Sequence, residues 1–372
     1  MNVLPDIFIE KVNRAQQDLV IFAVMRNESL RLHAWLRHYR DIGVRQFAIV
    51  DNGSTDATRD ILAAQDDVVF TRIDGGYAQS NFGVDWAHEF HDRISPGTWV
   101  LFADCDELLV YRGWPQSPLS AVLDKVRRQN RNAIYAFMLD MYPRGPLETA
   151  WLEEDSDIFQ VSPCFDLDYV FRFRPQKPWG KTGAALEIVG GPRVRILSSF
   201  EKEARSTWVD YWLCGQMDRI LPHVPDSLVA TVVRSMPRQM PCLSKVPLVL
   251  TGSGFRYTNA HGGTGGHLHG ENMVLCHFKF LADFARRVNE EAARKEHYRR
   301  GTEYILYADT IRRRGHLDLS YERSTEFKGA EQLVELGLIR DITPWCAQAP
   351  SPALIEAAAR KRPERVPDGL AS

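Results

Sequence analysis

The first third of the chain alternates short apolar runs with stretches of helical periodicity, and this alternation constrains the fold more than any other feature. The apolar runs occupy residues 19–24, 46–51, 68–73 and 98–104. Helical stretches separate them at residues 29–43, 57–65 and 79–94. The apolar runs lack a period of two, so both faces of each strand should be covered. The pattern predicts an α/β fold with a mostly parallel sheet and helices on both faces.

Polar motifs follow three of these apolar runs. They read MRNE at residues 25–28, DNGSTD at residues 51–56 and DCDE at residues 104–107. The carboxyl ends of parallel strands gather at one edge of a sheet, and such folds bind their ligands at that edge. We therefore expect one site that is built from all three motifs.

The DCDE motif places three carboxylates within four positions at the end of an apolar run. Unpaired buried carboxylates are costly, so they need a cation or a ring of hydrogen-bond donors. If the strand continues, Asp104 and Asp106 point the same way and Glu107 points away, because the side-chain period of a strand is two. Two oxygen ligands on one side suit Mg²⁺ or Mn²⁺, which also takes substrate phosphates as ligands. The structural alternative is an exposed acidic turn.

The other two motifs have both structural and functional interpretations. In DNGSTD, Asn52-Gly53 is a turn pair, and Asp56 suits the first turn of the next helix. Turn chemistry does not need an acid at the strand end, whereas Asp51 can accept hydrogen bonds there from a base or a ribose. In MRNE, Arg26 can bind phosphate and Asn27 a base edge. Taken alone, that motif reads as a surface loop that starts a helix.

Composition and charge describe an ordinary globular protein. The 372 residues are 44% hydrophobic and 25% charged, a length that suggests about two units. The net charge of −2 gives no global argument for nucleic acid. The charged N-terminus does not read as a signal peptide, and no apolar run approaches the ~20 residues of a spanning helix. The six cysteines form no CxxC pair, so we expect free thiols in the cytoplasm.

The three motifs, in this order on successive strands, resemble those of the family 2 glycosyltransferases, and most closely the family 2-like proteins of bacterial polysaccharide loci. The resemblance is strongest over residues 19–111 and continues more weakly to about residue 285, through GGPRVRI, LSKVPLVL and HFKF. It implies a GT-A domain at residues 1–285, with a nucleotide and metal half (19–111) and an acceptor half (112–285). Residues 286–372 would form a helical extension and a loosely packed tail.

The resemblance also implies roles for individual residues. The nucleotide of a sugar donor, with UDP as the first choice, would contact Arg26, Asn27, Glu28, Asp51, Asn52, Asp56 and Asp104. A Mn²⁺ or Mg²⁺ ion would be held by Asp104, Asp106 and His277. The implied reaction transfers a sugar to a hydroxyl of a glycan or lipid-linked glycan, by inversion and one sugar at a time, since processive motifs and membrane helices are absent. Peripheral contact with the inner face of the membrane stays open.

An inverting transfer needs a base near the acceptor hydroxyl, and a carboxylate is the simplest choice. The carboxylates considered are Asp140, Asp166, Asp168 and Glu187, and of these we name Glu187. Basic residues in the same half would hold a diphosphate or an anionic acceptor, or would form a solvated face: Arg172, Arg174, Lys177, Arg193 and Arg195.

Three other classes of protein compete with this interpretation. A zinc hydrolase would use His261, His267, His269 and His277, although their spacing is not a standard zinc set and the strand-end motifs stay unexplained. A non-catalytic nucleotide-sugar or glycan-binding module needs no base, but an intact DCDE motif argues against it. A sugar nucleotidyltransferase is disfavoured because the loop after the first strand, MRNESL, contains no glycine.

Overall fold

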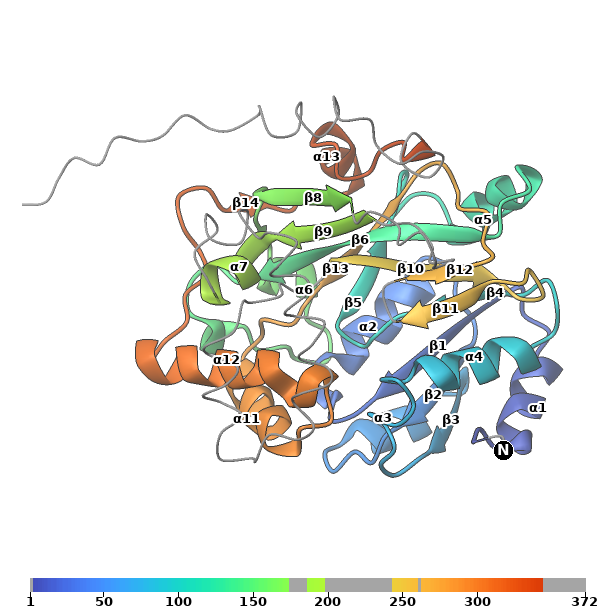
Figure 1. The fold of residues 1–372 in the computed structure, drawn as a ribbon, viewed down its shortest axis with the longest axis horizontal. Helices are drawn as coiled ribbons and strands as arrows, with labels where there is room; N and C mark the ends of the chain where they lie inside the picture. Colours follow the sequence, from blue (N-terminus) through green and yellow to red (C-terminus); the bar gives the residue numbers. More distant parts are fainter. Residues whose placement is uncertain (1–2, 174–185, 198–242, 260–261, 344–372) are drawn as a thin grey trace, which may run out of the picture.

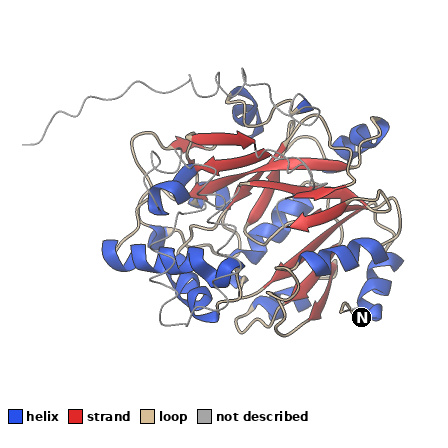
Figure 2. Cartoon of the chain, in the orientation of Figure 1, coloured by secondary structure: helices blue, strands red, loops and turns tan. Residues whose placement is uncertain are grey.

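The computed structural model describes residues 3–173, 186–197, 243–259 and 262–343. Its centre is a mixed sheet of ten strands (Figure 1). Figure 2 shows these strands gathered in the middle of the molecule with helices around them. The predicted α/β class is confirmed, and the sheet is parallel in part.

The N-terminal third forms a continuous parallel part of the sheet. It contains β1 (Leu19–Met25), β2 (Phe47–Asp51), β3 (Val68–Arg72) and β4 (Trp99–Phe102), paired in the order β4-β1-β2-β3. The connections include α2 (Ser29–Asp41), α3 (Thr58–Ala63) and α4 (Val84–Arg93), as the alternation predicted. Helix α1 (Asp6–Arg14) precedes this unit and lies against β3. Because β1, β2 and β4 run in the same direction, their three polar motifs meet at one edge.

The other strands of the sheet pair mostly in antiparallel fashion. They are β5 (Glu107–Val110), β6 (Ala133–Tyr142), β7 (Cys164–Phe165), β10 (Ser244–Leu250), β13 (Met273–His277) and β14 (Thr325–Glu326). Strand β10 lies between β4 and β6 and is antiparallel to both. Strand β13 lies between β5 and β6 and is parallel to β6. These pairings bring residues far apart in sequence to the edge where the motifs lie.

Residues 271–300 read as helical in the sequence, but the structure places a strand at their start. Met273–His277 is β13, and all five of its residues are buried between β5 and β6. A short apolar run suits either structure, and here pairing on both edges decides in favour of a strand. Helices α11 (Phe284–Arg294) and α12 (Tyr298–Arg314) follow and pack against each other. Figure 1 shows this pair in orange, away from the N-terminal helix α1.

Smaller elements complete the described part of the chain. The helices are α5 (Leu119–Arg128), η1 (Leu147–Thr149), α6 (Ile158–Val161), α7 (Gly191–Leu197) and α13 (Ala330–Glu335). Two further pairs of strands are antiparallel: β8 (Tyr169–Phe173) with β9 (Leu186–Gly190), and β11 (Arg256–Asn259) with β12 (Gly262–Thr264). Among the helices of the described ranges, none has the length and apolar character to cross a membrane. The part of the predicted extension and tail that follows residue 343 lies outside these ranges.

Helix α2 fixes the acidic DCDE turn from the core side. Its Trp35 and Tyr39 are fully buried. The Trp35 indole N–H donates to the carbonyl oxygen of Asp104 at 3.0 Å, and the Tyr39 hydroxyl donates to the carbonyl oxygen of Glu107 at 2.9 Å. Buried aromatic side chains of this kind need a partner for their polar tip, and these two find it in the backbone of the turn. The packing of α2 thereby sets where the carboxylates of the turn stand.

Candidate functional site

A pocket of about 270 Å³ lies at the carboxyl ends of the parallel strands. MRNE contributes Arg26 and Glu28 to its lining, DNGSTD contributes Asn52, and DCDE contributes residues 104–107. The predicted meeting of the three motifs at one site is therefore confirmed by their positions. Strands β10 and β13 add Lys245 and His277 to the same lining.

The C-terminal helices form another wall of the pocket. Phe284, Arg287 and Arg294 of α11 line it. Arg287 Nη1 donates to Glu28 Oε2 at 2.6 Å, and Arg294 Nη2 donates to Asn52 Oδ1 at 2.8 Å. The sequence reasoning ended the transferase domain at residue 285 and so missed this wall. The available signal was the repeat of charged residues at helical spacing, Arg287, Glu291 and Arg294, which places all three on one face of a helix.

The DCDE motif forms a turn and does not continue strand β4. Strand β4 ends at Phe102 and β5 begins at Glu107. Asp104 and Asp106 therefore meet different partners, which corrects the prediction that they point the same way. Lys245 Nζ lies 3.2 Å from Asp104 Oδ2 and 2.7 Å from Glu107 Oε2. Glu107 Oε2 also accepts the backbone N–H of Asp104 at 3.0 Å, so the buried Glu107 side chain closes the turn.

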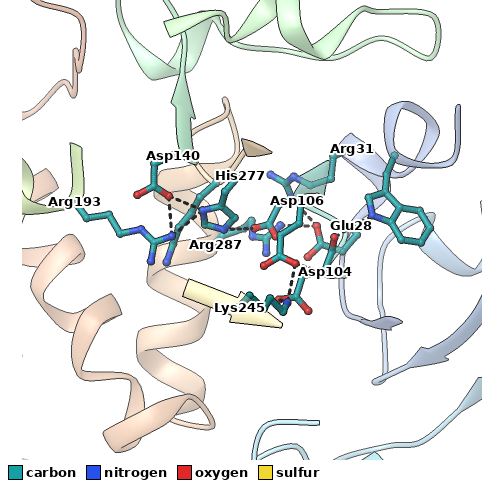
Figure 3. A network of polar contacts seen from close by, with 12 residues as sticks. Glu28, Arg31, Asp104, Asp106, Asp140, Arg193, Lys245, His277 and Arg287 are labelled. Atoms are coloured by element: carbon teal, nitrogen blue, oxygen red, sulfur yellow. Dashed lines mark hydrogen bonds and ion pairs between the residues drawn. The ribbon is translucent and has the colours of Figure 1, made fainter. Parts of the chain in front are cut away.

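Asp106 faces His277, and Asp140 stands on the other side of that imidazole (Figure 3). The distance from Asp106 Oδ2 to His277 Nε2 is 3.4 Å, and that from Asp140 Oδ1 to His277 Nδ1 is 2.6 Å. Strand pairing brings His277 and Asp140 together, because His277 of β13 is in register with Asp140 of β6. Arg193 Nη2 of α7 also donates to Asp140 Oδ1 at 2.7 Å. Asp140, one of the carboxylates considered as a base, is fully buried and bound by two cationic side chains.

The opposite charges of Asp106, His277 and Asp140 stabilise one another and so oppose the effect of burial on their pKa values. Burial alone favours the neutral acid, but His277 and Arg31 hold the pKa of Asp106 well below its usual range. Burial also disfavours a charged imidazole, yet Asp106 and Asp140 raise the pKa of His277 to about 9. Without a metal this arrangement favours the imidazolium form of His277, and a bound cation would take the place of its Nε2 proton.

Glu28 is held by arginines from two helices. Its Oε2 accepts from Arg31 Nη1 of α2 and from Arg287 Nη1 of α11, both at 2.6 Å. The fully buried Arg31 also donates to Asp283 Oδ1 at 2.6 Å. Burial raises the pKa of Glu28, and Arg31 opposes that rise. This cluster, which sequence reasoning missed apart from Glu28, joins the start of α2 to the start of α11.

Arg26 and Asn27 connect the loops that follow β1 and β2. Arg26 Nη1 donates to the carbonyl oxygens of Asn52 and Gly53 at 3.0 and 2.9 Å. Asn27 has a φ of 54°, a left-handed conformation that Asn tolerates better than most residues, and its Oδ1 accepts the Thr55 N–H at 2.8 Å. Arg26 and Asn27, which were both predicted to contact the nucleotide, therefore already form hydrogen bonds that hold the two loops together.

Asp56 caps helix starts, whereas Asp51 keeps one oxygen without a donor. Asp56 accepts the N–H of Ser29 at 3.1 Å and the hydroxyl of Thr58 at 2.6 Å. Asp51 is fully buried, and its Oδ1 accepts the Ser54 N–H at 3.0 Å. Within the described residues, Asp51 Oδ2 has no hydrogen-bond partner. A buried carboxylate oxygen in that state is costly, and a ligand N–H or hydroxyl would satisfy it.

The predicted base Glu187 is placed only by its backbone. It lies in β9, in register with Arg172 of β8, and its side chain lies outside what the structure describes. Two of the basic candidates, Arg174 and Lys177, also fall outside the described residues. The assignment of a base to Glu187 therefore stays a prediction.

Asp166, another candidate base, is committed to an ion pair. Arg195 donates to its two oxygens at 2.8 and 3.0 Å, and the Tyr142 hydroxyl donates at 2.6 Å. Asp166 is buried, and it is absent from the lining of the pocket described above. Its neighbour Asp168 is exposed. The ion pair of Arg195 and Asp166 thus stabilises the fold next to the pocket.

The structure separates the histidines of the alternative zinc site. His269 lies near the start of β6, where its N–H donates to the Ala133 carbonyl oxygen, whereas His277 pairs with Asp140 near the end of that strand. Seven residues of strand at about 3.3 Å each separate the two positions by roughly 23 Å. His267 is exposed, and His261 lies outside the described residues. The described part of the chain therefore does not form the predicted histidine cluster.

A divalent cation fits the position between Asp106 and His277. Asp140 engages Nδ1 of His277, as a carboxylate commonly does behind a metal-bound histidine, and so leaves Nε2 directed at Asp106. Mg²⁺ and Mn²⁺ are often held by one or two protein ligands, with waters and substrate phosphates as the rest. In the described ranges, no group of three or more His, Cys, Asp or Glu is arranged to hold a metal. Asp104, predicted as a third ligand, is bonded to Lys245 instead.

Comparison with known proteins adds little to this geometry. No family model and no curated protein matches the sequence. Among solved structures, one of S. aureus TarS has a TM-score of 0.24 at 14% identity, covering 50% of this chain and 27% of that chain. The structure of S. aureus TarS 1-349 has a TM-score of 0.27 at 11% identity, covering 84% of this chain and 99% of that chain. Scores this low carry no argument about function, which rests on the site.

Proposed function

We propose that this protein is a glycosyltransferase that moves a sugar from a nucleotide sugar to an acceptor hydroxyl. The observation that carries the proposal is the meeting of the three strand-end motifs with the Asp106–His277 pair in one pocket. The motif order resembles that of family 2 glycosyltransferases, and the pocket combines a loop suited to a nucleoside with a floor suited to a metal-bound diphosphate.

The loops after β1 and β2 would bind the nucleoside, for which uridine is the first choice. Asp51 has a buried oxygen that needs a donor, and a ribose hydroxyl or a base N–H supplies one. Asn27 and Arg26 hold the two loops in register, and Asn52 lines the pocket beside them. In this proposal Asp56 acts indirectly, by fixing the loop from which Asn52 projects.

Cationic side chains around the pocket would bind the diphosphate. Lys245 of β10, Lys279 in the loop after β13 and Arg294 of α11 line it. A departing nucleoside diphosphate gains negative charge, and preorganised cations stabilise that charge without further rearrangement. Asp106 and His277 would hold Mn²⁺ or Mg²⁺, which supplies Lewis-acid stabilisation of the same charge when bound. Asp140 would keep His277 turned so that Nε2 meets the ion.

The acceptor would enter from the second half of the chain. We keep Glu187 of β9 as the proposed base of an inverting, single-addition transfer, because Asp140 and Asp166 are each bound by an arginine. A glycan or lipid-linked glycan hydroxyl is the proposed acceptor, in the synthesis of a surface polysaccharide or glycoconjugate.

Calorimetry with UDP and with GDP, in the presence and absence of Mn²⁺, tests the proposal. We expect the wild type to bind one nucleotide in a Mn²⁺-dependent manner. Asp106→Asn should lose that dependence, while Asp124→Asn, which removes a carboxylate from the exposed side of α5, should bind as the wild type does. Absence of nucleotide binding in a folded wild type would overturn the proposal. Equal binding by the Asp106 variant would remove the metal from it.

A further inference from the structure

Lys245 is a buried lysine inserted into the acidic turn. It lies on β10, the strand between β4 and β6, and its side chain is only 3% exposed. Its Nζ contacts Asp104 and Glu107 at 3.2 and 2.7 Å and stands 5.0 Å from the centre of the Phe102 ring. Lysine is almost never buried unless it is paired, so this position has a specific electrostatic purpose.

The three carboxylates of the turn are divided between two cations. Lys245 pairs with both Asp104 and Glu107, and His277 faces Asp106. Figure 3 shows Lys245 beside Asp104, with the His277 and Asp140 pair on the other side of Asp106. Each carboxylate of the turn thus faces a cationic side chain of the chain itself, and the single charge of Lys245 is shared by two of them.

We propose that Lys245 is a resident cation that withholds Asp104 from a divalent ion and so weakens metal binding at the neighbouring Asp106–His277 position. The inference rests on the metal role given above to Asp106 and His277. A fixed ammonium close to the turn repels a second cation, and it also occupies the Asp104 oxygen that would otherwise join the ligand set. Such a device keeps metal affinity low until substrate phosphates supply the missing ligands.

Removal of Lys245 should therefore tighten metal binding. We expect Lys245→Met to bind Mn²⁺ alone roughly tenfold more tightly than the wild type, because one repulsive charge is lost and Asp104, with a side chain 47% exposed, is free to turn. Free Mn²⁺ can be counted from its EPR signal, with no nucleotide present. Adding Asp104→Asn to Lys245→Met should return the affinity toward the wild-type value. Lys125→Met, on the exposed side of α5, is the matched control and should change nothing.

A second variant keeps the inference testable if Lys245→Met does not fold. Lys245→Met leaves Glu107 buried and unpaired, which is destabilising. The double variant Lys245→Met with Glu107→Gln removes the buried charge and retains an oxygen to accept the Asp104 N–H. It should fold and also bind Mn²⁺ more tightly than the wild type. Unchanged or weaker Mn²⁺ binding by this folded variant would overturn the inference.

Variants that keep Lys245 give an independent check. Asp104→Asn should alter Mn²⁺ affinity by less than about threefold, whereas Asp106→Asn should weaken it by roughly tenfold or more. Equal losses would show that Asp104 is a metal ligand despite Lys245, and would overturn the inference. These measurements use the metal alone. A failure to bind any nucleotide would therefore contradict the proposed function without deciding the role of Lys245.

Discussion

Asp140 Oδ1 lies 2.6 Å from His277 Nδ1, across two neighbouring parallel strands, and this contact decides which nitrogen of His277 faces the pocket. Both residues are buried, so the imidazole has little freedom to rotate. With Nδ1 committed to Asp140, Nε2 is directed at Asp106. Asp140 is thus a positioning residue, since it acts on the pocket only through His277.

Replacement of Asp140 by Asn should weaken Mn²⁺ binding by about 10–100-fold, the usual effect of losing the carboxylate behind a metal-bound histidine. Asn keeps the size of the side chain but removes the charge that orients the imidazole. Calorimetric or EPR titration with Mn²⁺ measures the change, and circular dichroism verifies the fold. Asp166→Asn is the matched control, because it disturbs a similar buried arginine pair beside the pocket and should leave Mn²⁺ affinity unchanged. Comparable losses in the two variants would contradict the positioning role.

His38 predicts an acid-sensitive component of stability. Burial lowers the pKa of His38 from 6.5 to about 4, although its hydrogen bond with the Leu109 carbonyl oxygen opposes the shift. Between these two values the unfolded chain binds a proton that the folded chain excludes, so folding stability falls as the pH drops through this window. The shift corresponds to about 3 kcal/mol at most.

Urea unfolding of the wild type and His38→Gln, from about pH 7 to about pH 4.5, measures this component. The glutamine retains a donor for Leu109 and cannot titrate, so the stability difference between the two proteins should shrink toward acid pH in favour of the variant. His316→Gln, with a side chain 86% exposed in the wild type, should follow the wild-type curve. If the stability difference between the wild type and His38→Gln did not depend on pH, the His38 ring would be protonated as easily in the folded chain as in the unfolded chain.

The parallel part of the sheet could be predicted because its signals are local. Each strand of that unit is a short apolar run bounded by turn residues, and β2 (Phe47–Asp51) and β3 (Val68–Arg72) lie within the predicted runs 46–51 and 68–73. The geometry of the DCDE turn could not be read in this way. Strand β4 stops at Phe102, Trp35 and Tyr39 hold the backbone that follows, and no local pattern reveals those contacts.

The partners of the acidic residues were equally hidden. Lys245 reaches Asp104 from 141 positions away, and Asp140 meets His277 across 137 positions. These contacts depend on the insertion of β10 and β13 between strands that come earlier in the chain, an order that residue periodicity does not specify. Sequence reasoning therefore identified His277 through a resemblance, while it could place neither Lys245 nor the pairing role of Asp140.

Asp56 should prove to be a structural residue when tested apart from the rest of its motif. Because it accepts the Ser29 N–H and the Thr58 hydroxyl, Asp56→Ala should cost about 1 kcal/mol of folding stability, as the loss of a helix cap does. Nucleotide affinity should change by less than about threefold in that variant, since no Asp56 contact with the pocket is needed. Urea unfolding and calorimetry give the two numbers. The exposed Asp66→Ala is the control, and a large loss of nucleotide affinity at unchanged stability would assign Asp56 to the binding site instead.

The buried Arg31 should be the most costly residue of the Glu28 cluster to remove. Its guanidinium links Glu28 of MRNE to Asp283 at the start of α11, and Arg31→Met leaves Asp283 without its closest cation. Breaking a buried pair from one side typically costs about 3–5 kcal/mol, which is several times the effect expected of the exposed control Arg59→Met.

A double-mutant cycle then tests whether this pairing, rather than general packing, is the cause. Asp283→Asn removes the charge that Arg31 compensates, so adding it to Arg31→Met should cost less than it does in the wild type, with a coupling of about 1 kcal/mol or more. Urea unfolding of the four proteins provides the cycle. Because α11 carries Arg287 and Arg294 to the pocket, a loosened α11 should also weaken nucleotide binding in Arg31→Met. Additive stability changes would mean that Arg31 supports the fold without tethering α11 to α2.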